Sequence, residues 1–78
     1  MPRFHFHVYN DLVAMDEEGV ELPDMAAARE HAIEGARALM GESIMQGRLR
    51  LQDRIEVADP DGRVLMTIPF PEVVDIQG

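Results

Sequence analysis

Two histidines near the start of the chain have the spacing of a metal-binding pair. His5 and His7 are separated by one residue, so in a β-strand their imidazoles lie on the same side, about 7 Å apart. Such a pair binds zinc or another transition metal only when a third ligand converges on it. Glu56 and His31 are the candidates for that ligand. The alternative interpretation is a pair of surface or interface histidines that binds no metal.

Other side chains with catalytic potential lack the setting that catalysis requires. Residues 16–18 carry three carboxylates, but an acidic run before Gly19 is typical of an exposed turn. Residues 59–62 lack the downstream bidentate glutamate of a calcium loop. Ser43 lies in a predicted helix, away from the strained turn that presents a nucleophile. We therefore expect no catalytic residues, no cofactor, no small-molecule substrate and no enzyme activity.

The longest element that the sequence predicts is a helix over residues 24–46. Asp24 is suited to the N-cap, and Gly47 is suited to the left-handed position that follows a helix. Nine apolar residues fall within one arc of about 160° around this helix. They are predicted to face the core: Met25, Ala26, Ala28, Ala32, Ile33, Ala36, Leu39, Met40 and Ile44.

Alternating polarity on both sides of the helix predicts four strands, over residues 2–9, 12–22, 51–58 and 63–68. Residues 59–62, Asp-Pro-Asp-Gly, are a hairpin turn between the last two strands. Residues 71–78 follow as a tail. The inward-facing residues of these strands include Phe4, Phe6, Val57 and Met66, together with Leu51 and Val64.

This element order predicts a single α+β domain over residues 1–78, with the arrangement β-β-α-β-β. The simplest architecture is an antiparallel four-stranded sheet with one long helix packed on one face. Phe4, Phe6, Val57 and Met66 should then converge beneath Ala32, Ala36 and Leu39. The second face of the sheet stays uncovered and is where we expect a partner. Its candidate interface residues are His5, His7, Tyr9, Arg54, Glu56, Leu65 and Thr67.

The charge balance disfavours nucleic acid as a general partner. Fifteen acidic residues oppose seven arginines, no lysine is present, and the formal net charge is -8. Binding to phosphate backbones depends on an excess of Lys and Arg. The exception is local, because three of the arginines fall in residues 48–54: Arg48, Arg50 and Arg54.

Composition also indicates the compartment. No apolar run approaches the roughly 20 residues of a membrane span. Residues 1–10 lack the apolar segment of a signal peptide. The chain has no cysteine, which fits a reducing environment. We therefore expect a cytoplasmic protein without a membrane partner.

Three stretches together resemble a family of small bacterial domains of unknown function. They are residues 1–8 (MPRFHFHV), residues 16–24 (DEEGVELPD) with AAR at 27–29, and residues 54–59 (RIEVAD) with DG at 61–62 and IPF at 68–70. The resemblance covers nearly the whole chain and implies a strand-strand-helix-strand-strand domain without an assigned activity. The element order alone is also similar to the partial ribonuclease-H-like fold of HicB-type antitoxins, which implies no shared function.

Small size, a semi-apolar second sheet face and the lack of a catalytic set favour a non-enzymatic protein-interaction module. We expect it to self-associate as a homodimer, through the open sheet face or a sheet edge. One alternative is an antitoxin-like or regulatory component that binds a protein toxin or a nucleic acid through Arg48, Arg50 and Arg54. Another is metal binding through His5 and His7.

Overall fold

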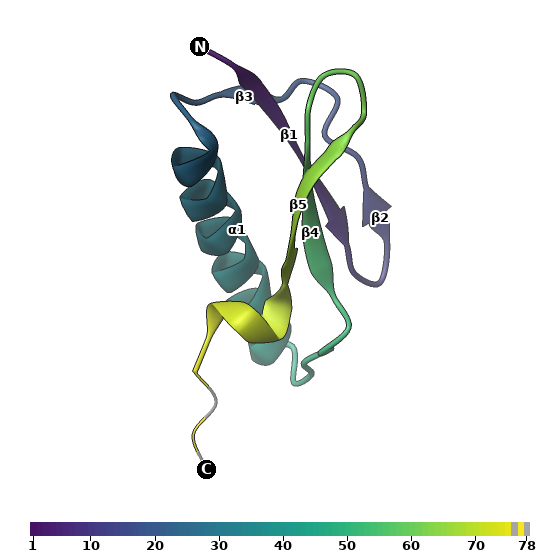
Figure 1. The fold of residues 1–78 in the computed structure, drawn as a ribbon. Coiled ribbons are helices and arrows are strands. Elements are labelled where there is room, and N and C mark those ends of the chain that lie inside the picture. Colours follow the sequence, from purple (N-terminus) through teal and green to yellow (C-terminus); the bar gives the residue numbers. More distant parts are fainter. Residues whose placement is uncertain (76, 78) are drawn as a thin grey trace.

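A long helix lies across one face of an antiparallel sheet in the computed structural model, which describes residues 1–75 and 77 (Figure 1). The fold class predicted from the sequence, α+β with one long helix, is confirmed. The elements in chain order are β1 (Arg3–Tyr9), β2 (Val13–Ala14), β3 (Val20–Glu21), α1 (Met25–Met45), β4 (Arg54–Ala58), β5 (Val64–Pro69) and the short 3-10 helix η1 (Phe70–Val73).

The sheet has the order β2-β1-β4-β5, and β3 also pairs with β1. β1 and β4 form the centre, with Phe6 opposite Val57 and His7 opposite Glu56. Paired residues of adjacent strands lie on the same face. The register therefore gives one face directed at α1 and an opposite outer face, and the alternation read from the sequence for β1 and β4 is correct.

The helix begins and ends where its capping residues predict. The Asp24 carboxylate accepts a hydrogen bond from the backbone N–H of Ala27 at 2.8 Å, as an N-cap does. After the last turn, Gly47 has φ +86°, the left-handed conformation that glycine adopts without steric cost.

The core forms where the helix crosses the central strands. Phe4, Ala32, Ala36 and Val57 are buried in it. Phe6, Leu39 and Met66 pack against these residues. The predicted convergence of the two sets of residues is confirmed. A stripe of alanines permits this close approach, because alanine adds little bulk between backbone and sheet.

The buried arc of the helix is narrower than predicted. Met25, Ala26 and Ile44 are exposed, and the fully buried helix residues are Ala28, Ala32, Ala36 and Met40. These four lie at intervals of four residues along one line of the helix. Ile33 and Leu39 beside this line are half-buried against the core, so the prediction was wrong only for Met25, Ala26 and Ile44, which lie near the ends of the helix.

Two of the predicted strands have different bounds in the structure. The predicted strand over residues 12–22 is divided into β2 and β3, because residues 15–19 leave the ladder and Gly19 turns with φ +75°. The predicted strand over residues 51–58 begins only at Arg54. Leu51, predicted to face inward, is exposed, and Asp53 is the buried residue that precedes β4.

A β-bulge reverses the predicted orientation at the start of β5. Val57 pairs with Met66, but Ala58 pairs with Val64, so Leu65 is an extra residue on β5. Leu65 packs against the core, and Val64 is 48% exposed. Predicting Leu65 on the outer face and Val64 in the core was therefore wrong. A strict two-residue alternation has no place for an inserted residue.

The segment after β5 turns into η1, whose Phe70 and Val73 are buried. Arg37 of α1 donates a hydrogen bond to the Val73 carbonyl at 2.7 Å and so ties η1 to the helix. Residues 71–73 of the predicted tail are therefore part of the packed structure. Residues 76 and 78 of that tail lie outside the described residues. Within residues 1–75 and 77, no helix combines the length and hydropathy of a membrane span.

Candidate interaction surface

The outer face brings together most of the residues that the sequence selected as an interface. By register, Tyr9 lies beside Arg54, His7 lies beside Glu56, and Thr67 lies on the other side of Glu56. The guanidinium of Arg54 stacks on the Tyr9 ring at 4.1 Å and donates to Glu56 Oε2 at 3.0 Å. The charged groups at the centre of this face are thus paired with each other.

His5 and His7 are both bound to the backbone of Asp16. Their rings stack with centroids 6.2 Å apart. The Asp16 carbonyl only accepts, so His5 Nδ1, at 2.7 Å, is the donor. The Asp16 N–H donates to His7 Nδ1 at 3.1 Å, so that nitrogen is unprotonated. The two histidines join the segment after β2 to the outer face of β1.

The Asp16 carboxylate is itself held by backbone amides. It accepts from the N–H groups of Phe6 and Gly19, each at 3.1 Å. Burial raises the pKa of the Asp16 carboxyl, but these two hydrogen bonds and the electrostatic influence of the neighbouring His5 and His7 outweigh it, so the pKa lies below its ordinary value. The ionised carboxylate therefore belongs to the folded state.

The geometry does not complete the metal site considered from the sequence. His31 packs against Phe6, with ring centroids 4.6 Å apart, on the helix side of the sheet. It therefore lies across the sheet from His5 and His7. Among residues 1–75 and 77, no three His, Asp or Glu side chains are grouped closely enough to hold a metal ion.

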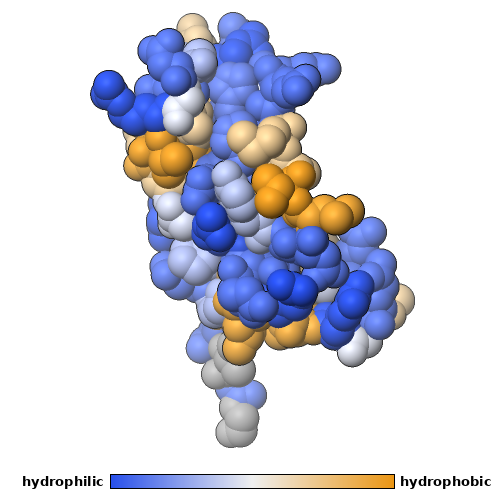
Figure 2. All heavy atoms as spheres, turned by 90° about the vertical axis from the view of Figure 1, so that its right-hand side faces the viewer, coloured by the Kyte–Doolittle hydropathy of each residue, from blue (hydrophilic) through white to orange (hydrophobic). Residues whose placement is uncertain are grey.

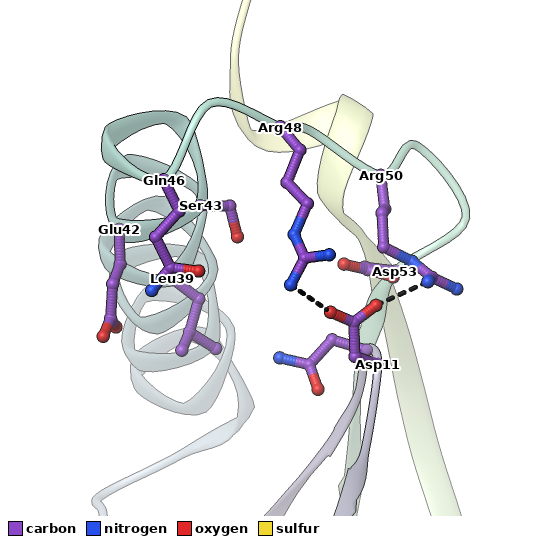
Figure 3. Close-up of a pocket in the computed structure, with 9 residues that line it drawn as sticks. Asp11, Leu39, Glu42, Ser43, Gln46, Arg48, Arg50 and Asp53 are labelled. Atoms are coloured by element: carbon purple, nitrogen blue, oxygen red, sulfur yellow. Dashed lines mark hydrogen bonds and ion pairs between the residues drawn. The ribbon is translucent and has the colours of Figure 1, made fainter.

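A polar pocket of about 190 Å³ lies between the end of α1 and the turn after β1 (Figure 3). Two arginines of the α1–β4 loop, residues 46–53, are directed at Asp11 in that turn. Arg48 pairs with its carboxylate at 3.1 Å, and Arg50 pairs with it and with the buried Asp53. The pocket is lined by Asn10, Asp11, Leu39, Glu42, Ser43, Gln46, Arg48, Arg50 and Asp53.

These ion pairs occupy the basic segment that the sequence offered as a nucleic-acid contact. Arg48 and Arg50 pair with Asp11, and Arg54 pairs with Glu56. A phosphate would compete with a carboxylate at each of the three guanidinium groups. The local arginine cluster therefore forms no unopposed positive patch.

In the α1–β4 loop, charged side chains point toward the protein and apolar side chains point toward solvent. Its arginines turn toward Asp11 and Asp53, and the alternating Leu49 and Leu51 are exposed. Ile44 and Met45 at the end of the helix are exposed as well. A small apolar surface thus lies at this end of the molecule, and the inward ion pairs hold it in place.

A second apolar surface is a run of four consecutive residues, 12–15, which we call the apolar arm. Leu12 is 78% exposed, Val13 59% and Met15 56%, and Ala14 is also exposed. Val13 and Ala14 form β2, and Val13 lies opposite Tyr9 at the border of the outer face. In Figure 2, hydrophobic residues on this side form separate patches with hydrophilic residues between them.

The apolar arm was not among the sites predicted from the sequence. Residues 12–15 were interpreted there as the first part of the predicted strand over residues 12–22. The signal was nonetheless present, because Leu-Val-Ala-Met lacks the alternation of a half-buried strand. A continuous apolar run indicates burial on both sides, which this edge of the single chain does not supply.

The architecture defines a small α+β domain with one covered sheet face. The chain belongs to the family described as Domain of unknown function (DUF6894), whose profile matches residues 3–71. Neither a curated protein nor a solved structure matches the chain. The family assigns no activity, so a function has to be argued from the surfaces described above.

Proposed function

We propose that this protein is a non-enzymatic interaction module that self-associates, and that the apolar arm lies in the contact. The observation that carries this proposal is the exposure of four consecutive apolar residues beside a sheet edge. Exposed apolar side chains concentrated at one edge are unfavourable in water and are typical of contact sites on soluble proteins. Covering it with another copy removes that cost.

The arm is fixed at both ends, which supports a role in binding. Asp11, just before it, is held by Arg48 and Arg50. Asp16, just after it, is held by His5, His7 and two backbone amides. A segment that is already ordered loses less conformational entropy when it binds. The histidines singled out from the sequence thus have a positioning role in this proposal.

The residues at the centre of the outer face are less suited to the contact than the apolar arm. Arg54, Glu56 and Tyr9 are already engaged with one another. Burying them against a partner would gain little, because exposed ion pairs contribute about 0–1 kcal/mol. The association energy has to come from apolar residues at the border of this face, where the arm lies.

Sedimentation velocity over a range of concentrations tests the proposal. We expect the wild-type protein to shift from its 8.8 kDa monomer to twice that mass as concentration rises. Val13→Glu should remain monomeric over the same range, because a carboxylate at the centre of the apolar arm has to be desolvated in the contact.

Leu51→Glu is the matched control, since it places the same charge on the other exposed apolar surface. It should associate as the wild type does. Association lost in Leu51→Glu and kept in Val13→Glu would move the contact to the end of α1. A wild-type protein that stays at 8.8 kDa throughout would remove self-association altogether.

A further inference from the structure

We infer that two copies associate by pairing their β2 strands edge to edge, so that one antiparallel sheet continues through the dimer. The inference rests on the proposed self-association and specifies its geometry. Strand pairing satisfies the outward backbone N–H and C=O groups of the edge and buries the apolar side chains beside them.

Among the described residues, β2 is the short sheet edge that carries no proline, bulge or charged side chain. β5 carries a bulge at Leu65 and ends at Pro69, which has no N–H to donate. Bulges and prolines are features that keep edges from pairing. β3 is flanked by Gly19 and Pro23, and its Glu21 is paired with Arg3. The apolar arm contains no proline, glycine or charge.

Symmetry restricts the register of such a pair. In an antiparallel ladder, hydrogen-bonded and non-hydrogen-bonded residue pairs alternate, and a two-fold axis perpendicular to the sheet passes through the centre of one such pair. In a symmetric dimer, the two residues of that pair are therefore copies of each other. The axis therefore passes beside either Val13 or Ala14. With Ala14 at the axis, Asp11 would lie opposite Glu17 of the partner subunit, and two like charges would meet.

With Val13 at the axis, no like charges lie opposite one another over residues 11–15. Val13 lies opposite Val13 of the partner subunit, and Leu12 lies opposite Ala14 of the partner subunit. Asp11 then faces Met15 of the partner subunit and keeps its ion pairs with Arg48 and Arg50 of its own chain. The charge pattern thus favours Val13 as the centre of the contact.

The net charge of -8 on each copy agrees with a contact at this place. Two such chains repel each other, and the repulsion is least where acids are already compensated. Both acids that flank the arm meet this condition, because Asp11 is paired with two arginines and the Asp16 carboxylate accepts from two backbone amides. The arm is therefore the apolar edge at which a second copy meets least opposition.

Thiol cross-linking tests this geometry, and the absence of native cysteine leaves only the introduced thiol to react. A Val13→Cys variant treated with a short bis-maleimide at concentrations where it is dimeric should give a covalent dimer. The matched control is Val64→Cys, of similar exposure but on the opposite sheet edge. We expect a several-fold larger cross-linked fraction for Val13→Cys.

Sedimentation of the same samples distinguishes a failure of the β2 pairing from a failure of self-association. Dimers in solution with equal cross-linking of Val13→Cys and Val64→Cys would overturn the β2 pairing while self-association stands. Dimers in which Val64→Cys links faster would place the contact at β5. Monomers in sedimentation, with no covalent dimer from either variant, would overturn both proposals.

Discussion

At the scale of single residues, Asp16 has the largest influence on the local structure. Its carbonyl, its N–H and its carboxylate each bind a different part of β1 or the following turn. From the sequence alone, Asp16 is one of three acids in a turn expected to be exposed. The partners of Asp16 in β1 lie about ten residues earlier in the chain, and no local pattern reports contacts at that separation.

Asp16→Asn should lower the free energy of unfolding at neutral pH by about 1–2 kcal/mol, because one of the two carboxylate oxygens becomes an NH2 group that cannot accept from the Phe6 or Gly19 N–H, and the other becomes a neutral acceptor. Chemical denaturation measures this loss. Glu17→Gln, an exposed acid in the same turn, is the control and should change stability little. Equal effects of the two substitutions would contradict the role of Asp16.

The pH dependence of stability follows from the lowered pKa of Asp16. The folded state binds this proton less readily than the unfolded state, so the stabilisation is present above the ordinary carboxyl pKa of about 3.9 and is lost as pH falls through the lower folded value. Denaturation curves below about pH 5 should therefore show a shallower loss of stability in Asp16→Asn than in the wild type. Parallel acid limbs would contradict the assigned shift.

Gly19 is the second residue with a sharp local requirement. Its φ is +75°, and an added Cβ would lie 2.8 Å from Arg3 Cγ and 3.0 Å from the Phe4 carbonyl oxygen. Gly19→Ala should therefore cost more than the about 1 kcal/mol typical of the left-handed conformation alone. Gly47→Ala has φ +86° with no atom within 4 Å, and it isolates the backbone cost. Thermal unfolding compares the two, and an equal loss would show that the close approach has no effect.

At the scale of elements, the helix was the most predictable part. Asp24, Gly47 and the alanine stripe indicated its ends and its buried line correctly. The β5 bulge was not predictable, because Val64 and Leu65 are both strand-forming apolar residues and only the pairing with β4 decides which one turns inward. Local patterns fix an element, and neighbouring strands fix its register.

Two glycines within α1 provide a prediction at this scale. An added Cβ at Gly35 would lie 3.6 Å from Ile55 Cδ1, an ordinary contact distance. Gly35→Ala should therefore stabilise the protein by up to about 1 kcal/mol, the difference in helix propensity between the two residues. Gly41→Ala, which meets no atom within 4 Å, should give a similar gain. Chemical denaturation measures both, and a loss at Gly35 alone would show that the helix lies closer to β4 than described.

At the scale of the whole molecule, the sequence predicted the sheet faces but not the positions of the apolar surface. The outer-face set was placed correctly except for Leu65; its other members are His5, His7, Tyr9, Arg54, Glu56 and Thr67. Their mutual pairing was not foreseen, and neither was the exposure of Leu49 and Leu51. Leu49 and Leu51 are exposed because Arg48 and Arg50 turn inward to acidic side chains. Arg48 and Arg50 meet Asp11 only in the folded chain.

The large negative charge gives the proposed dimer a characteristic salt dependence. Raising ionic strength from about 0.01 M to about 1 M shortens the Debye length from about 30 Å to about 3 Å and so weakens the repulsion between two copies. The dissociation constant should therefore fall as salt is added. Sedimentation equilibrium measures it, and weaker association in high salt would indicate a contact made by ion pairs in place of the apolar arm.

The most direct test of self-association through the apolar arm is a dilution series followed by the backbone amide resonances. We expect the amides of residues 12–15 to shift as the protein is diluted from millimolar to micromolar concentration. Amides on the exposed side of α1, such as those of Glu30 and Glu34, should stay fixed. Resonances of residues 12–15 that do not move over this range would contradict the account.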